Sequence, residues 1–101
     1  MLIKRIGEPA TLELLAEECT ELAHAALKLA RVKRGENPTP KTLEECQRSV
    51  LEEWADVIIC LGELADLSWT NGDEWEMIYD KKMDRMKRRL TGEETEIDQK
   101  G

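Results

Sequence analysis

The chain has 101 residues, of which 15 are Lys or Arg and 22 are Asp or Glu, and its formal net charge is -7. This length suits one modest domain, whose small core favours oligomerisation as a way to bury more apolar surface. The acidic balance argues against non-specific binding to nucleic acid or anionic membranes, and no apolar run approaches the roughly 20 residues that cross a bilayer.

A first helix is predicted from near Pro9 to about Val32. Proline suits the first turn of a helix, because its φ is already helical and no N–H is lost there. The residues between Pro9 and Val32 include no glycine or proline. The segment 34–40, which contains Gly35 and two prolines, is a clear break.

A second helix is predicted from Thr42 to about Leu67. Thr42 and Glu45 have the Thr-x-x-Glu spacing of a capping box, in which each side chain accepts the other residue's backbone N–H. Gly62 is the one weak position in this helix, and residues 68–72 form the next turn.

A third helix is predicted from a cap at Asp73 to about Leu90, and the polar tail of residues 91–101 is expected to be loose. The sequence shows no alternating strand pattern. It therefore predicts an all-α domain over residues 1–90, a helical bundle of three main helices. Pairing with a second copy would complete a four-helix core.

The three cysteines, Cys19, Cys46 and Cys60, form no closely spaced pair. We expect free thiols in a reducing cytoplasm, and the quickly charged first residues do not suit a signal peptide. His24 is the only histidine, so the sequence does not favour a zinc site.

Two acidic clusters, residues 17–21 (EECTE) and 52–56 (EEWAD), lie in the first and second predicted helices. The last four residues of each cluster are an acid-x-x-acid unit. Residues three apart on a helix project from nearly the same side, so each unit offers two carboxylates to one point. The first acids, Glu17 and Glu52, fall on the polar faces of their helices and are expected to be solvated.

Helical phase places the other four acids differently. Glu18 and Glu53 fall inside apolar stripes, within about 80° of the apolar residues on their own helices. Glu21 and Asp56 lie at the margins of the same stripes. The apolar neighbours are Leu15, Leu22, Ala26 and Leu29 on the first helix, and Val50, Val57, Leu61 and Leu64 on the second.

Four carboxylates cannot stay ionised side by side in a half-buried site without cations. Hard divalent metals such as Mg2+ prefer oxygen ligands, so the pattern favours a metal site formed by Glu18, Glu21, Glu53 and Asp56. Buried salt bridges are the alternative. Lys28 falls beside Glu21 and could pair with one acid, but the two helices offer too few cations for four.

The units Glu18-x-x-Glu21 and Glu53-x-x-Asp56, on successive helices of an all-α domain, resemble those of MazG-like nucleoside triphosphate pyrophosphohydrolases, members of the all-α NTP pyrophosphatase superfamily. The local sequences EECTEL and EEWADV resemble the two signatures of that family. A single acid-x-x-acid unit is common and does not indicate a family, whereas two units in matching helical phase support the resemblance. The resemblance covers residues 10–90.

The resemblance implies that Glu18, Glu21, Glu53 and Asp56 are the catalytic and metal-binding residues, with Mg2+ as the cofactor and Mn2+ as a substitute. An NTP or dNTP would be cleaved at the α-phosphorus to a nucleoside monophosphate and pyrophosphate. A homodimer or tetramer is implied, with no membrane or nucleic-acid partner. A non-catalytic helical module that binds a metal or nucleotide is the alternative.

Lys28, Lys82 and Arg89 are candidates for binding the substrate phosphates. Six of the nine residues in 81–89 are basic, although the helix dipole alone favours cations at a helix C-terminus. Family members often carry Lys, then Asn, then Arg on this helix, and here Met86 stands where the Asn would fall.

Two further features are the long connection between the acidic clusters, which departs from the family pattern, and the aromatic residues. The 31 residues between Glu21 and Glu53 are long for the family, and the loop 37–40 within them either connects helices, as we expect, or shapes a nucleotide pocket. Trp54 is expected in the core, with base stacking as the alternative. Trp75 and Tyr79 are expected to pack against another helix or subunit.

Overall fold

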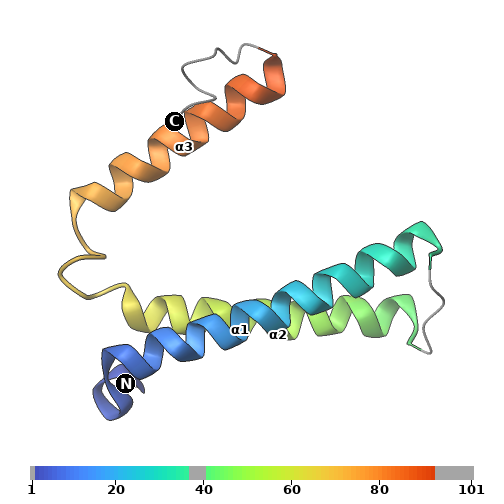
Figure 1. Ribbon diagram of the computed structural model, residues 1–101, viewed down its shortest axis with the longest axis horizontal. Helices are drawn as coiled ribbons and strands as arrows, with labels where there is room; N and C mark the ends of the chain where they lie inside the picture. Colours follow the sequence, from blue (N-terminus) through green and yellow to red (C-terminus); the bar gives the residue numbers. More distant parts are fainter. Residues whose placement is uncertain (1, 37–40, 93–101) are drawn as a thin grey trace. The chain divides into compact units, whose positions relative to one another are not determined.

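A computed structural model of the chain describes residues 2–36 and 41–92, and its regular structure in these ranges consists of three helices and no strand. Helix α1 covers Leu2–Arg34, α2 covers Leu43–Leu64 and α3 covers Asp73–Thr91 (Figure 1). The prediction of an all-α chain with three main helices is confirmed. The predictions for the loop 37–40 and for most of the tail, 93–101, lie outside the described residues.

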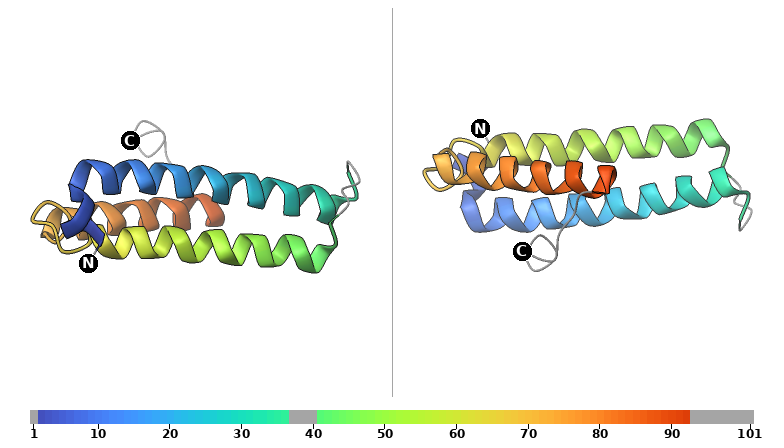
Figure 2. Two further views of the ribbon diagram at one scale, coloured as in Figure 1. Left: turned by 90° about the horizontal axis from the view of Figure 1, so that it is seen from below. Right: turned by 90° about the horizontal axis from the view of Figure 1, so that it is seen from above.

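The chain divides into two units, Met1–Asp66 and Leu67–Gly101. In the first unit, α1 and α2 run antiparallel and lie side by side along most of their length (Figure 2). Their shared face buries a short set of mostly small side chains, which lets the two helices approach closely. These residues are Thr11, Ala25, Cys46, Val57, Cys60 and Leu64.

Helix α1 is kinked at Gly7, where φ is 87° and ψ is 165°. This left-handed backbone conformation favours glycine, because a Cβ would be strained there. The long straight part of α1 begins beyond the kink, near Pro9, as predicted. The preceding helical turn at residues 2–6 was not predicted. The buried Thr11 hydroxyl donates a 2.7 Å hydrogen bond to the Gly7 carbonyl across the kink.

A tertiary hydrogen bond ties this N-terminal turn to α2. The backbone N–H of Ile3 donates to Glu63 Oε1 at 2.9 Å. First-turn N–H groups have no acceptor within their own helix, so a carboxylate on another helix satisfies one of them. The contact fixes the beginning of α1 beside the C-terminal part of α2.

The predicted capping box at the start of α2 is confirmed. The Glu45 N–H donates to Thr42 Oγ1 at 3.1 Å, and the Thr42 N–H donates to Glu45 Oε1 at 2.9 Å. The helix ends at Leu64, three residues before the predicted Leu67. At the helix end, the Ala65 N–H donates to the Gly62 carbonyl at 3.4 Å, which tightens the last turn. The Leu67 carbonyl then accepts from the Thr70 and Asn71 N–H groups in the following turn.

In the second unit, the prediction that Asp73 caps α3 is wrong. Gly72 is the N-cap, without a side-chain hydrogen bond, and Asp73 is the first helical residue. Acids in a first turn still stabilise a helix through its dipole. The rings of Trp75 and Tyr79 stack on each other, with centroids 5.1 Å apart and planes inclined by 15°. The helix ends at Thr91, and Gly92 is its C-cap, with a left-handed φ of 78° that is typical of a helix C-terminus.

Within the first unit, α1 leaves one face of α2 exposed. Leu51, Trp54, Ile58 and Leu61 follow the 3-4-3 spacing of a helix-packing stripe, and all four are exposed. The prediction that Trp54 packs in the core is wrong for this chain, since its exposed fraction is 56%. In the described residues, none of the helices has both the length and the apolar character needed to cross a membrane.

Candidate metal centre

The antiparallel arrangement of α1 and α2 brings the two acid-x-x-acid units together in opposite order. Glu18 on α1 lies against Asp56 on α2, and Glu21 lies against Glu53. The order is reversed because the chain directions of the two helices oppose each other. Both acids of one acid-x-x-acid unit therefore face acids of the other, and all four predicted carboxylates lie in one region.

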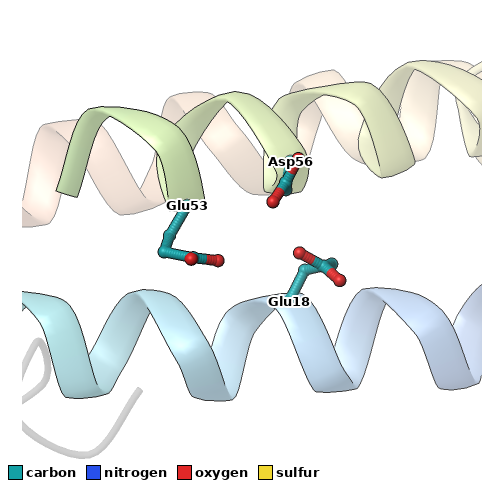
Figure 3. A group of neighbouring side chains, drawn as sticks. All are labelled: Glu18, Glu53 and Asp56. Atoms are coloured by element: carbon teal, nitrogen blue, oxygen red, sulfur yellow. The ribbon is translucent and has the colours of Figure 1, made fainter. Parts of the chain in front are cut away.

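Three of the four carboxylates converge on one point. One oxygen from each of Glu18, Glu53 and Asp56 lies within 4.8 Å of the others. Figure 3 shows the three side chains meeting in the space between α1 and α2. Glu21 stands outside this group and is exposed, but it contacts Glu53. We call Glu18, Glu53 and Asp56, together with Glu21, the acidic cluster.

Burial within the acidic cluster follows the predicted helical phase. Glu18 and Glu53, which fall inside the apolar stripes, are half-buried, whereas Glu21 and Asp56 at the stripe margins are exposed. The preceding acids Glu17 and Glu52 are also exposed, as predicted. The two half-buried acids are thus held close to the apolar contact face of the helix pair.

The surroundings of the half-buried acids favour their neutral forms. Burial raises the pKa of Glu18, and its carboxyl contact with Asp56 and the charges of Asp56, Glu21 and Glu53 raise it further. Burial likewise raises the pKa of Glu53, followed by its contact with Glu21 and the charges of Glu21, Asp56 and Glu52. The neighbouring carboxylates therefore make ionisation of Glu18 and Glu53 more costly, which a bound cation would reverse.

Two oxygens of the acidic cluster lack partners. Glu18 Oε2 and Glu53 Oε2 are shielded from solvent and accept no hydrogen bond from the part of the chain that the structure describes. Within the described residues of the first unit, 2–36 and 41–66, no Lys, Arg or His forms an ion pair with any of the four acids. Carboxylate oxygens without donors fit a hard divalent cation such as Mg2+ or Mn2+.

The thiol beside the acidic cluster does not change this donor set. Cys60 is buried, and burial followed by the charges of Glu18 and Asp56 raises its pKa. A thiol binds metals as the thiolate, so a neutral Cys60 is a poor ligand. All three cysteines are free, as the sequence predicts. The site is thus an oxygen site, and its chemistry does not suit zinc.

A cavity of about 210 Å³ opens between α1 and α2 next to the acidic cluster. Lys28, predicted to bind phosphate, lies in its wall. The sequence analysis missed Lys41, His24 and Ser49 there. Among the described residues, the lining consists of Glu21, His24, Ala25, Lys28, Lys41, Cys46, Ser49 and Glu53. We call this cavity the basic pocket, after its two lysines.

Part of the basic pocket could have been found from the sequence. Lys28 follows Glu21 by seven residues, two turns on the same helix face, and His24 lies between them. Lys41 gives no such signal, because it precedes α2 and reaches the pocket only through the reversal of the chain between the helices.

Lys82 and Arg89, the other predicted phosphate-binding residues, are exposed on α3 in the second unit. Met86, which replaces the expected Asn between them, is also exposed. The phosphate-binding role of Lys82 and Arg89 stays a prediction.

Comparison of the chain with protein families, with curated proteins and with solved structures finds no match. The resemblance to MazG-like enzymes therefore rests on the paired acids and their local sequences alone. The function must be argued from the residues of the acidic cluster and the basic pocket.

Proposed function

We propose that the protein is a Mg2+-dependent nucleoside triphosphate pyrophosphohydrolase of the MazG-like kind. The observation that carries this proposal is the convergence of Glu18, Glu53 and Asp56, with partnerless shielded oxygens on Glu18 and Glu53. Such a set of carboxylates is costly for a fold to assemble and becomes favourable once a divalent cation is held there.

Glu18, Glu53 and Asp56 would hold Mg2+, or Mn2+ in its place, with Glu21 beside them. When bound, the metal supplies charge neutralisation for the triphosphate and lowers the pKa of a coordinated water. The four carboxylates supply positioning. Glu18 and Glu53 are half-buried between two packed helices, which limits their movement. Fixed charges contribute most to phosphoryl chemistry.

The proposed reaction is hydrolysis at the α-phosphorus. The oxygen of a water molecule forms a bond to this phosphorus, and the bond between the phosphorus and the oxygen bridging to the β-phosphate breaks. The bonding electrons leave with pyrophosphate, and the nucleoside monophosphate keeps the water oxygen. A carboxylate of the acidic cluster accepts the proton released from water.

The uncovered stripe on α2 supports a homodimer or tetramer. A second copy covering Leu51, Trp54, Ile58 and Leu61 would bury this apolar surface and complete the four-helix core. Lys82 and Arg89 would contribute to phosphate binding. The free thiols fit a reducing compartment such as the cytoplasm, and the negative net charge does not favour nucleic acid or membrane partners.

The proposal is tested with a panel of canonical and modified NTPs and dNTPs in Mg2+ or Mn2+, scoring pyrophosphate against orthophosphate. Release of pyrophosphate from at least one nucleotide is expected. Orthophosphate alone would mean cleavage at a different phosphorus. If no nucleotide is cleaved while Mg2+ still stabilises the protein, the acidic cluster belongs to a non-catalytic metal- or nucleotide-binding module.

A further inference from the structure

The basic pocket continues directly from the acidic cluster. Glu21 and Glu53 line the pocket and also belong to the cluster, so the two share a wall. Along α1, the order is Glu18, Glu21 and then Lys28, which lies roughly 10 Å beyond Glu21 along the helix axis. The space between α1 and α2 is therefore negative at the acidic cluster and carries two ammonium groups further on.

The donors in the basic pocket suit an anionic group. Lys28 and Lys41 approach it from different helical elements, one within α1 and the other just before α2. The imidazole of His24 adds a third polar group. Ser49 contributes little as a donor, because its hydroxyl already donates to the Glu45 carbonyl at 3.1 Å. Lysine ammonium groups are common phosphate donors in proteins, and here they come from two separate segments of the chain.

The size and lining of the basic pocket argue against a nucleobase. Its volume of about 210 Å³ is below the range of roughly 300–1,000 Å³ typical of pockets for whole small ligands. Its lining contains no Phe, Tyr or Trp on which a base could stack. The pocket therefore suits a compact, charged part of a larger ligand.

We propose that the basic pocket binds the β- and γ-phosphates of a metal-bound nucleoside triphosphate through Lys28 and Lys41. These are the phosphates that leave together as pyrophosphate. The α-phosphorus then lies at the acidic cluster, and the nucleoside extends away from the pocket. The identity of the ligand as a nucleotide rests on the proposed function, whereas binding of pyrophosphate by the pocket does not require catalysis.

The test is calorimetric titration of inorganic pyrophosphate into the full chain in the presence of Mg2+. Lys28→Ala and Lys41→Ala are each expected to weaken pyrophosphate binding about 10-fold, the typical effect of one charge-assisted contact. Lys28→Arg and Lys41→Arg keep the charge and are expected to lose less. Lys33→Ala is the matched control, because Lys33 is an exposed residue of the last turn of α1 outside the pocket.

Unchanged pyrophosphate affinity in both alanine variants, with Mg2+ still bound, would overturn the proposal. An equal loss of pyrophosphate affinity in Lys33→Ala would also overturn it, because the loss would then follow from the net charge of the protein and not from contacts in the pocket. Circular dichroism checks that each variant is folded. If an alanine variant does not fold, the pyrophosphate affinity of the corresponding arginine variant is measured in its place.

Separate outcomes test the proposed function. If both alanine variants cleave a nucleotide with unchanged KM and unchanged pyrophosphate affinity, the hydrolase stands and the pocket assignment fails. If pyrophosphate binds through Lys28 and Lys41 but no nucleotide is cleaved, the pocket assignment stands and the hydrolase fails.

Discussion

The acids between α1 and α2 and the acids of α3 differ in their surroundings. On α3, Asp84 is exposed and pairs with Arg88 at 2.9 Å one turn away. Between α1 and α2, Glu18 and Glu53 are half-buried, face other carboxylates and form no ion pair with the described residues of the first unit. Both regions are rich in charge, but only the second concentrates charge of one sign where solvent is partly excluded. Local acidity therefore does not distinguish the two regions, whereas burial and pairing do.

The largest expected effect concerns catalysis. Glu18→Gln keeps the size of the side chain but removes a charged ligand, and it should lower pyrophosphate release from the best nucleotide by about 100-fold or more. Glu17→Gln changes the adjacent, exposed acid and should stay within about twofold. Equal activities of the two variants would show that burial in the acidic cluster does not matter for the reaction.

The next effect concerns stability in the presence of metal. Saturating Mg2+ at about 100 times its Kd should stabilise the wild type by about 2.7 kcal/mol, which thermal unfolding detects as a higher Tm. Glu53→Gln should lose most of this increase. Without metal, however, the same variant should be at least as stable as the wild type, because it removes repulsion among carboxylates. A drop in metal-free Tm would argue for a structural role of Glu53.

The pH dependence of metal-free stability should separate the acidic cluster from ordinary acids. The pKa values of Glu18 and Glu53 are raised in the folded protein, so their contribution is complete below the ordinary glutamic acid pKa and is lost as pH rises through the raised values. The pKa of Glu45 is lowered, chiefly by the hydrogen bond from the Thr42 backbone. Its contribution is present above the ordinary pKa and is lost on acidification.

Urea unfolding in EDTA between about pH 4 and about pH 8 measures this contrast. Glu53→Gln should reduce the loss of stability at higher pH, and Glu45→Ala should reduce the loss at lower pH. Added Mg2+ should reverse the wild-type trend, since metal binding requires ionised carboxylates. A wild-type profile unchanged by Glu53→Gln would contradict the assigned surroundings of this residue.

The smallest effect is expected on α3. Asp84→Asn removes an exposed ion pair and should lower the free energy of unfolding by no more than about 0.5 kcal/mol. Its response to Mg2+ should equal that of the wild type. A loss of Mg2+ stabilisation in this variant would mean that α3 takes part in the metal site, and the contrast between the two regions would fail.

Local sequence rules predicted the features that depend on one helix. The capping box of Thr42 and Glu45 needs only residues three apart, and helical phase was enough to distinguish the half-buried Glu18 from the exposed Glu17. The contact between acids of different helices was also predictable, because both units lie in matching phase and share an apolar face.

Features that depend on the partner of a helix were missed or wrong. Trp54 lies on the apolar side of α2, but this side is wider than the face that α1 covers. A position on the apolar side of the helix was therefore not enough to predict burial. The N-terminal turn depends on the hydrogen bond from Ile3 to Glu63, 60 residues away. Lys41 lines the basic pocket although it precedes α2, and its sequence neighbours do not specify this position.

Calorimetric titration of Mn2+ tests the central claim, that half-buried carboxylates between α1 and α2 form a divalent metal site. Three proteins are compared: the wild type, Glu53→Gln and Glu52→Gln, which changes the adjacent exposed acid. The wild type and Glu52→Gln should bind Mn2+ with affinities within about threefold, and Glu53→Gln should bind about 10- to 100-fold more weakly. Absence of binding to the wild type, or equal binding by the two variants, would contradict the claim.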